Sequence, residues 1–378
     1  MGTLMSKSSF RIFATCDIGD SFDLLRERGY QVEVYPGPEA PPKALVIEKV
    51  CSGVDGLITT LRDPIDAEVF EAGKDTLKGV AQYAVGYDNI NRADANRYGI
   101  PFTHTAEVLT DATAEFALAM LLAVSRKLAP SEELVREQRW GSWHPYLPFL
   151  GDEVTGKTLA VIGMGRIGQA LIRKVAGLEM NVLCCDPACK NDSFANAMQK
   201  LMDSAHELGL STRRNWIRNA SLEECLGEAD YVSLHVPLLC ATDSDKPTYH
   251  LINARTLRMM KPTAYLINTA RGPIVDEKAL YTALKERWIA GAALDVFEQE
   301  PLPANSPLRD PELADRLRLF PHFASGGVAT RLSSDPNVGM AGRCVQGLID
   351  MMEENHGGDV TKMPYVVNKE VFRARKTA

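Results

Sequence analysis

The sequence contains no apolar stretch long enough to cross a bilayer. Its longest strongly apolar run, residues 116–124, has nine residues, whereas a membrane-spanning helix needs about 20. The sequence also lacks an excess of basic residues, because 42 Lys and Arg face 49 Asp and Glu and the net charge is −7. Nucleic-acid-binding proteins usually present a basic surface. We therefore expect neither membrane insertion nor nucleic-acid binding.

The eight cysteines are scattered and lack the paired CxxC spacing of zinc sites. No secretory signal, internal repeat or low-complexity tract is recognisable. A chain of this length needs no disulfides to stabilise its core. We therefore expect reduced thiols, no metal site and a cytoplasmic protein.

Short apolar strands alternate with helical segments along most of the chain, which is typical of α/β proteins. The 378 residues leave room for about two domains. We predict two α/β domains with parallel sheets and a cleft between them. The expected strands are residues 11–16, 31–36, 56–61, 79–86, 158–163, 180–186, 231–237, 264–270, 290–297 and 317–322.

Three further segments read as helices. Residues 107–128 are apolar on most sides, so we expect a long helix buried between layers. Residues 191–219 lengthen the connection that follows the expected strand 180–186. Their apolar residues recur at helical spacing, which predicts an added surface helix. The amphipathic segment 339–354 follows the last strand, and we expect this terminal part to return to the first domain.

The stretch VIGMGRIGQA places Gly163, Gly165 and Gly168 in GxGxxG spacing between an expected strand and an expected helix. In that context the turn admits a pyrophosphate at the helix N-terminus. Asp186 ends the next strand, 18 residues after Gly168 (186 − 168). A carboxylate there accepts hydrogen bonds from an adenosine ribose and repels a 2′-phosphate. We predict NAD as cofactor and NADP as less favoured, although Lys190 lies close enough to weaken that preference.

Three chemically capable side chains follow three expected strands: Arg271, Glu300 and His322. Taken singly, each is explained as a surface or loop residue, but the carboxyl ends of parallel strands border the ligand site. Together they suit hydride transfer to a 2-oxo acid. His322 would act as general acid, Glu300 would orient it and favour its charged form, and Arg271 would hold the carboxylate above Gly272 and polarise the carbonyl. His235 is a rival imidazole on a strand expected nearer the adenosine.

The motifs AVGYDNIN, VLTDATAEFALAMLLAVSR, VIGMGRIGQA, LINTARGPIVDE, ALDVFEQEP and FPHFAS together resemble the D-2-hydroxyacid dehydrogenase family, from about Gly56 to Gly327. The resemblance implies two Rossmann-like, doubly wound domains and a dimer. It places the first part of the substrate domain at residues 1–106. The NAD-binding domain would occupy residues 107–328, and residues 329–378 would return to the substrate domain.

The resemblance also assigns residues to the site. Arg271, Glu300 and His322 match the family's catalytic residues. Val85 and Gly86 match its carboxylate cradle, made of backbone amides, and Leu61 and Arg62 match a further substrate loop. The expected cofactor contacts are Gly163, Gly165, Arg166, Ile167, Gly168, Asp186, Pro237, Thr248, Thr269, Ala270 and Asp295, the last beside the nicotinamide.

Within the family the chain most resembles the glyoxylate/hydroxypyruvate reductases. Trp143, in WGSWHPYLPFLG, matches a tryptophan that reaches the neighbouring subunit's active site, which implies a homodimer. The alternative is a buried or interface aromatic without substrate contact, because an aromatic is first of all a packing residue. The chain departs from the family at His104 and Glu107, where asparagine and glycine are usual, and in a longer segment between residues 237 and 248. These departures bear on the cofactor preference and on the closure of the domains over the substrate, but not on the reaction class.

Other readings remain open at this point. Formate dehydrogenases share the scaffold but carry glutamine at the position of Glu300. Phosphoglycerate dehydrogenases share the three catalytic residues but usually need further charge for the phosphate. Dinucleotide-sensing corepressors of the same fold also retain the three residues, and fold alone does not settle function. We expect an NAD-dependent oxidoreductase that acts on a small 2-oxo or 2-hydroxy acid.

Overall fold

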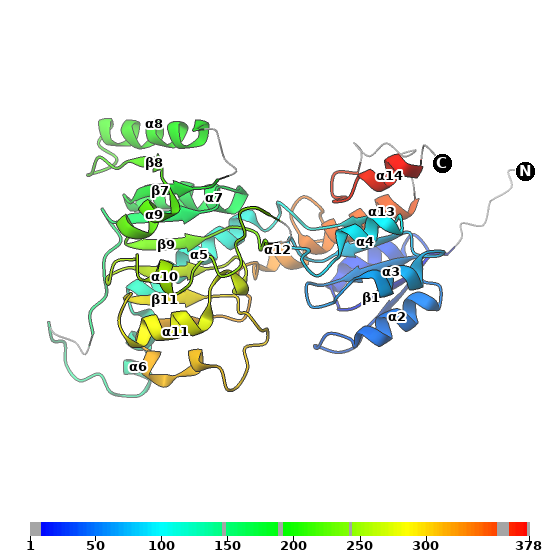
Figure 1. Cartoon of the computed structure of the whole chain (residues 1–378), viewed down its shortest axis with the longest axis horizontal. Helices are drawn as coiled ribbons and strands as arrows, with labels where there is room; N and C mark the ends of the chain where they lie inside the picture. Colours follow the sequence, from blue (N-terminus) through cyan, green and yellow to red (C-terminus); the bar gives the residue numbers. More distant parts are fainter. Residues whose placement is uncertain (1–8, 146–148, 188–191, 242–243, 354–362, 376–378) are drawn as a thin grey trace, which may run out of the picture. The chain divides into compact units, whose positions relative to one another are not determined.

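The computed structural model describes residues 9–145, 149–187, 192–241, 244–353 and 363–375. The chain divides into two compact units (Figure 1). Unit 1 comprises Met1–Leu109 and Gly326–Ala378, and unit 2 comprises Thr110–Ser325. Helix α5 (Thr110–Ser125) begins unit 2. Both ends of the chain thus belong to unit 1.

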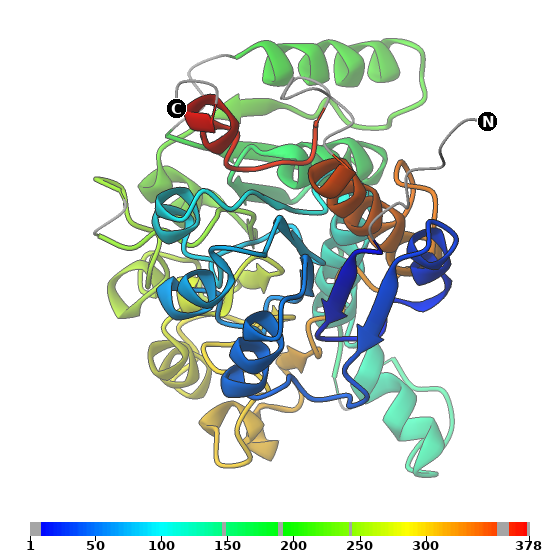
Figure 2. The ribbon, with the colours of Figure 1, turned by 90° about the vertical axis from the view of Figure 1, so that its right-hand side faces the viewer.

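Unit 1 is built on a parallel five-stranded sheet with the order β2-β1-β3-β4-β5. Successive residues of β1 face opposite sides of this sheet: Ile12 and Ala14 pack with α13, and Phe13 packs with α2 and α3. In Figure 2 helix α13 is drawn in dark orange next to the blue strands of this sheet, and it packs against β3, β4 and β5. Its strands are β1 (Arg11–Ala14), β2 (Gln31–Val34), β3 (Gly56–Thr59), β4 (Gly79–Gln82) and β5 (Phe102–Thr103). Its helices are α1 (Asp23–Arg26), α2 (Lys43–Cys51), α3 (Ala67–Gly73), α4 (Arg92–Arg97), α12 (Val328–Leu332), α13 (Met340–Glu353) and α14 (Glu370–Arg375), with the 3-10 turn η1 (Gly19–Phe22).

Unit 2 is built on a parallel seven-stranded sheet with the order β12-β11-β10-β9-β6-β7-β8. The strand order reverses between β6 and β9, which is the point where doubly wound sheets bind ligands. Its strands are β6 (Thr158–Ile162), β7 (Asn181–Cys185), β8 (Ile217–Asn219), β9 (Tyr231–Leu234), β10 (Tyr265–Asn268), β11 (Gly291–Leu294) and β12 (Leu317–Leu319). Its helices are α5 (Thr110–Ser125), α6 (Leu128–Arg136), α7 (Arg166–Val175), α8 (Ser193–Glu207), α9 (Leu222–Glu228), α10 (Ala254–Leu257) and α11 (Glu277–Lys285). Short 3-10 turns are η2 (Ala176–Leu178), η3 (Gly272–Ile274), η4 (Pro307–Arg309) and η5 (Pro311–Leu313).

Both faces of the unit 2 sheet are covered, so its central strands are mostly apolar on both sides. Ala160 and Ile162 of β6 join the core beneath α9, α10 and α11. Leu159 and Val161 join the opposite core, beneath α5 and α7. The alternation along one strand therefore fixes two separate cores, as the α/β pattern of the sequence predicts.

The predicted fold class is confirmed, and each of the ten expected segments contains a strand. The sequence did not reveal β5 and β8, which have two and three residues and are too short to show a period. The segment 191–219 contains the expected helix α8, but its last residues pair with β7 as the edge strand β8. In the part of the chain that the structure describes, no helix is both long and apolar enough to span a membrane.

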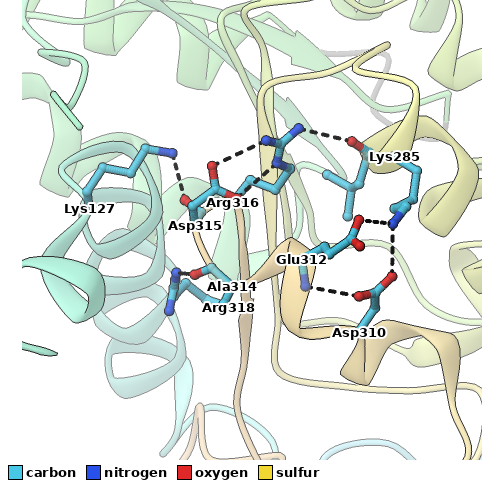
Figure 3. A network of polar contacts seen from close by, with 9 residues as sticks. Lys127, Lys285, Asp310, Glu312, Ala314, Asp315, Arg316 and Arg318 are labelled. Atoms are coloured by element: carbon cyan, nitrogen blue, oxygen red, sulfur yellow. Dashed lines mark hydrogen bonds and ion pairs between the residues drawn. The ribbon is translucent and has the colours of Figure 1, made fainter. Parts of the chain in front are cut away.

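A polar network holds the segment that leads into β12 (Figure 3). Its charged members are Lys127, Lys285, Asp310, Glu312, Asp315, Arg316 and Arg318. The ammonium of Lys127 donates to the Asp315 carbonyl at 2.9 Å. The guanidinium of Arg316 binds the Asp315 carboxylate at 3.1 Å and also donates to the Leu284 carbonyl at 3.2 Å. These bonds fix the start of the strand whose far end leads to His322.

Candidate active site

The glycine turn joins β6 to α7, as its sequence context predicts. Gly163 has φ +102°, and a Cβ there would lie 2.6 Å from the carbonyl of His235. A Cβ at Gly168 would lie 2.1 Å from the Gly163 oxygen. At Gly165, the residue before α7, a Cβ would meet no atom within 4 Å. The first and third glycines are thus required by packing, while the second leaves space in front of the helix N-terminus, where Arg166 and Ile167 begin α7.

The surroundings of this turn fit a dinucleotide. Asp186 follows β7 directly, and its carboxylate accepts a hydrogen bond from the Met164 amide at 2.8 Å, which places it at the glycine turn. The hydroxyl of Thr269 is buried without a hydrogen-bond partner among the described residues. A buried polar atom without a partner is costly unless a ligand completes it. Lys190, which the sequence raised as a complication, lies outside the described residues.

The loop after β9 carries two further expected cofactor contacts. The Thr248 hydroxyl donates to the Pro237 carbonyl at 2.6 Å, and it accepts the Leu239 amide at 2.8 Å. Thr248 therefore closes the long loop that begins at Pro237. Residues 242–243 of this loop lie outside the described residues.

The sheet order gathers the three expected catalytic side chains. Arg271, Glu300 and His322 follow β10, β11 and β12, which are direct neighbours in the sheet. Because the strands are parallel, their carboxyl ends lie at one edge. Residues that are distant in the sequence therefore meet within unit 2.

His322 and Glu300 form a hydrogen-bonded pair. The imidazole Nδ1 lies 2.8 Å from Glu300 Oε2, and each side chain is 29% exposed. A carboxylate can only accept, so Nδ1 carries the hydrogen, and Nε2 is the nitrogen through which the protonated ring can transfer a proton. Burial alone would raise the pKa of Glu300. The hydrogen bond and charge of His322, the Phe297 amide at 3.0 Å and the charge of Arg271 outweigh burial and lower this pKa.

Asp295 holds the backbone that carries His322. Its carbonyl accepts the His322 amide at 2.8 Å, and its carboxylate accepts the amides of Phe323 and Ala324 at 2.6 and 2.8 Å. His322 has φ +53°, a left-handed conformation that costs a non-glycine residue about 1 kcal/mol. The three bonds from Asp295 stabilise this conformation. Burial raises the pKa of the Asp295 carboxyl, as does the charge of Glu300, against the opposing effect of the two amides.

Arg271 stands at the strand end that the sequence indicated. The Asn268 side chain donates to the Arg271 carbonyl at 2.9 Å and accepts the Ala270 amide at 3.0 Å, which shapes the turn. The Arg271 guanidinium donates to the Ala270 carbonyl at 2.8 Å. A Cβ at Gly272 would lie only 1.8 Å from the carbonyl carbon of Phe297. Gly272 therefore allows the backbone after Arg271 to cross directly against the segment that leads to Glu300.

His235, the rival imidazole, is differently placed. Its Nε2 is hydrogen-bonded to the Ser233 hydroxyl at 2.9 Å, and its backbone lies against Gly163. Burial lowers the pKa of His235 to about 4. It is therefore a neutral ring beside the glycine turn near neutral pH, and none of the carboxylates that the structure describes is paired with it.

The expected substrate residues of unit 1 lie on two loops that are hydrogen-bonded together. The Asn89 amide donates to the carbonyls of Thr60 and Asp63 at 3.0 and 2.7 Å, which flank Leu61 and Arg62. The Gln82 amide donates to Asn89 at 2.7 Å and to the Gly86 carbonyl at 3.2 Å. Gln82 and Asn89 were not among the residues predicted from the sequence, although Asn89 lies within the motif AVGYDNIN. The guanidinium of Arg62 donates to the Pro38 carbonyl at 2.7 Å.

Trp143 is not a buried packing residue within its own chain, because it is 78% exposed. Trp140 is 53% exposed on the same segment, of which residues 146–148 lie outside the described residues. Among the residues that the structure describes, no group of three or more His, Cys, Asp or Glu side chains is arranged to hold a metal ion.

Comparisons with known proteins agree with this geometry. The family model of the D-isomer specific 2-hydroxyacid dehydrogenase, NAD binding domain, matches residues 118–324. A glyoxylate reductase of Korarchaeum cryptofilum is 42% identical over 366 residues, which cover 97% of this chain and 98% of that protein. A crystal structure of a protein from Thermus thermophilus is 38% identical, with a TM-score of 0.76 over 91% of this chain and 97% of that one.

A crystal structure of an NADPH-dependent glyoxylate/hydroxypyruvate reductase from Sinorhizobium meliloti, in complex with NADP and malonate, is 28% identical. Its TM-score is 0.70, over 91% of this chain and 93% of that one. These matches confirm the family predicted from the motifs, and they support NAD(H) binding by unit 2. Since the family model matches more than half of the residues and the relatives align along nearly the whole length, this chain belongs to the D-isomer specific 2-hydroxyacid dehydrogenase family.

Proposed function

We propose that this protein reduces small 2-oxo acids, glyoxylate and hydroxypyruvate among them, with NADH. The observation that carries the proposal is the pair of His322 and Glu300 at 2.8 Å, close enough to Arg271 for its charge to lower the pKa of Glu300. An acid, its orienting carboxylate and an anion-binding guanidinium are the groups that this reaction needs. The names of the relatives from K. cryptofilum and S. meliloti support the choice of substrates.

Each residue of the site has a separate role in the proposed reaction. Bound NADH supplies the hydride for the carbonyl carbon. The protonated His322 donates the Nε2 proton to the carbonyl oxygen, so that the 2-oxo acid, NADH and one proton give the 2-hydroxy acid and NAD. Glu300 accepts the Nδ1 hydrogen and stabilises the charged ring. Arg271 binds the substrate carboxylate and polarises the carbonyl.

Unit 1 supplies further substrate contacts in this proposal. The backbone at Val85 and Gly86 binds the carboxylate, and the loop at Leu61 and Arg62 contacts the rest of the substrate. The hydrogen bonds from Gln82 and Asn89 support this assignment because they hold both loops in one arrangement. Ordered loops bind with a smaller loss of conformational entropy.

We further propose a preference for NADH over NADPH of at least about tenfold, because Asp186 would repel the 2′-phosphate. The proposed cofactor contacts are the glycine turn with Arg166 and Ile167, the loop closed by Thr248, and the strand end at Thr269. Because the S. meliloti relative is NADPH-dependent, the test is to measure kcat/KM of this protein with NADH and with NADPH. Equal kcat/KM with the two cofactors would reject the assignment of Asp186.

A cytoplasmic homodimer is the proposed state of the protein. The support for the dimer is that Trp143 and Trp140, 78% and 53% exposed, lie on one segment, because aromatic residues are enriched at protein–protein interfaces. Light scattering of the purified protein tests the dimer. In the intact dimer, Trp143→Ala should raise the KM for hydroxypyruvate, and an unchanged KM would remove Trp143 from the site.

The decisive experiment follows NADH oxidation with a panel of 2-oxo acids for the wild type and His322→Gln. The wild type should turn over glyoxylate or hydroxypyruvate rapidly. The variant should lose about 10²- to 10⁴-fold in kcat, the usual contribution of a general acid, while binding NADH normally. A wild type that binds NADH without turnover would refute the proposal and favour a dinucleotide-sensing scaffold. Near-normal kcat in His322→Gln would refute the acid role.

A further inference from the structure

We propose that His104 is a positioning residue that orients the backbone cradle for the substrate carboxylate. The inference rests on the proposed function, because it names what holds the turn at residues 85–87 in its binding conformation. His104 occupies a position where the family resemblance leads us to expect asparagine. The role proposed for His104 is therefore inferred from this chain and is not carried over from the family resemblance.

The turn after β4 offers a row of backbone donors. Val85, Gly86 and Tyr87 follow one another outside any helix or strand. Among the described residues, none accepts a hydrogen bond from the N–H groups of these three. By contrast, their carbonyls are engaged, since Val85 O is bonded to His104, Gly86 O to Gln82 and Tyr87 O to the Ile90 amide.

The hydrogen bonds to these carbonyls also determine the direction of the N–H groups that follow them in the chain. In a trans peptide the C=O of one residue and the N–H of the next point in opposite directions. The bond from His104 to Val85 O, at 2.9 Å, therefore turns the Gly86 N–H away from His104. The bond from Gln82 to Gly86 O, at 3.2 Å, turns the Tyr87 N–H away from Gln82 in the same manner. Where such successive amides point to the same side, they form an anion-binding concavity.

His104 is itself held firmly enough to act as a support. A carbonyl can only accept, so the His104 Nδ1 carries the hydrogen in the bond to Val85. The ring packs edge-on against Tyr87 with 5.7 Å between centroids. The His104 amide donates to the Tyr365 carbonyl at 3.3 Å. The ring is therefore held by its contacts with Val85 and Tyr87, and the backbone that carries the ring is held by the bond to Tyr365.

The test compares two replacements at one position. His104→Leu removes the donor but keeps an apolar side chain, and His104→Asn retains an N–H that can reach the same carbonyl. Loss of one positioning hydrogen bond should raise the KM for glyoxylate or hydroxypyruvate roughly tenfold in the leucine variant. The asparagine variant should restore most of the affinity. In both variants kcat, the Kd for NADH and the Tm should stay near the wild-type values.

His206→Leu is the matched control, because His206 Nδ1 is likewise bonded to a backbone carbonyl, that of Ser211 at 3.4 Å, but in the last turn of helix α8 of unit 2. Its KM should be unchanged. A wild-type KM in His104→Leu would overturn the inference. So would a joint loss of kcat, NADH binding and Tm that asparagine fails to rescue, since that pattern marks a general structural role. If the wild type itself reduces no 2-oxo acid, the proposed function fails first, which separates the two failures.

Discussion

Replacement of Gly272 by alanine tests how closely the catalytic segments cross. The added Cβ would lie 1.8 Å from the Phe297 carbonyl carbon and 1.9 Å from its oxygen. Ordinary contact begins at 3.4 Å, so the two segments must separate by about 1.6 Å. One segment carries Arg271 and the other leads to Glu300, the partner of His322.

The expected effect on catalysis exceeds the effect on stability. A misplacement of about 1 Å costs on the order of 100-fold in rate, so kcat/KM should fall at least that far. Overpacking typically destabilises by about 1–3 kcal/mol, which lowers Tm by roughly 2–4 °C per kcal/mol in a unit of this size. At 25 °C the variant should therefore remain folded but be nearly inactive.

The assay is steady-state NADH oxidation beside thermal unfolding, with Gly177→Ala as control. Gly177 lies in η2, and a Cβ there would meet no atom within 4 Å. The control should keep wild-type kcat/KM and Tm. If folded Gly272→Ala stays within about threefold of the wild type, or if Gly177→Ala loses as much activity, the crossing does not position the catalytic residues and the reasoning is wrong.

Three further predictions follow from the same site. Arg271→Lys should chiefly raise the KM for the 2-oxo acid, by about 10- to 100-fold, because lysine loses the planar fork of donors; a normal KM with a low kcat would contradict this. Thr269→Val should leave Tm unchanged or slightly higher, because the buried hydroxyl has no partner among the described residues, yet it should weaken NADH binding, and fluorescence titration that shows wild-type affinity would exclude a cofactor contact. For Glu300, burial favours a higher pKa, but the bond to His322 and the nearby charges lower the pKa below its ordinary 4.5. A lowered folded-state pKa adds stability above the unfolded pKa, and this stability is lost as the pH falls through the folded value. The wild type should thus lose its advantage in unfolding free energy over Glu300→Gln as the pH falls from above the ordinary Glu pKa of 4.5 through the lowered folded-state pKa, and a constant difference across urea titrations from neutral to acidic pH would refute the stabilising role of the pair.

The local pattern determined much of this protein without any structure. Strand-length apolar runs and helical segments alternate regularly, so β6 and its glycine turn before α7 were predictable from residue order alone. Arg271, Glu300 and His322 were predictable because each follows a strand, and the carboxyl ends of parallel strands share one edge. The long insertion was visible as a helix, because α8 keeps its apolar residues at helical spacing.

The contacts between loops and strand ends became apparent only in the tertiary structure, because the spacing of residues along the sequence does not predict them. That Asp295 holds the left-handed backbone at His322 was not predictable from residue order, because this contact joins the ends of two neighbouring strands. The tight crossing at Gly272 likewise depends on Phe297, which is distant along the chain. In unit 1 the bonds of His104, Gln82 and Asn89 became apparent only when the loops after β3 and β4 were brought together. Periodicity reports which face of an element is buried, but hydrogen bonds between loops depend on the three-dimensional path of the backbone, which no local pattern encodes.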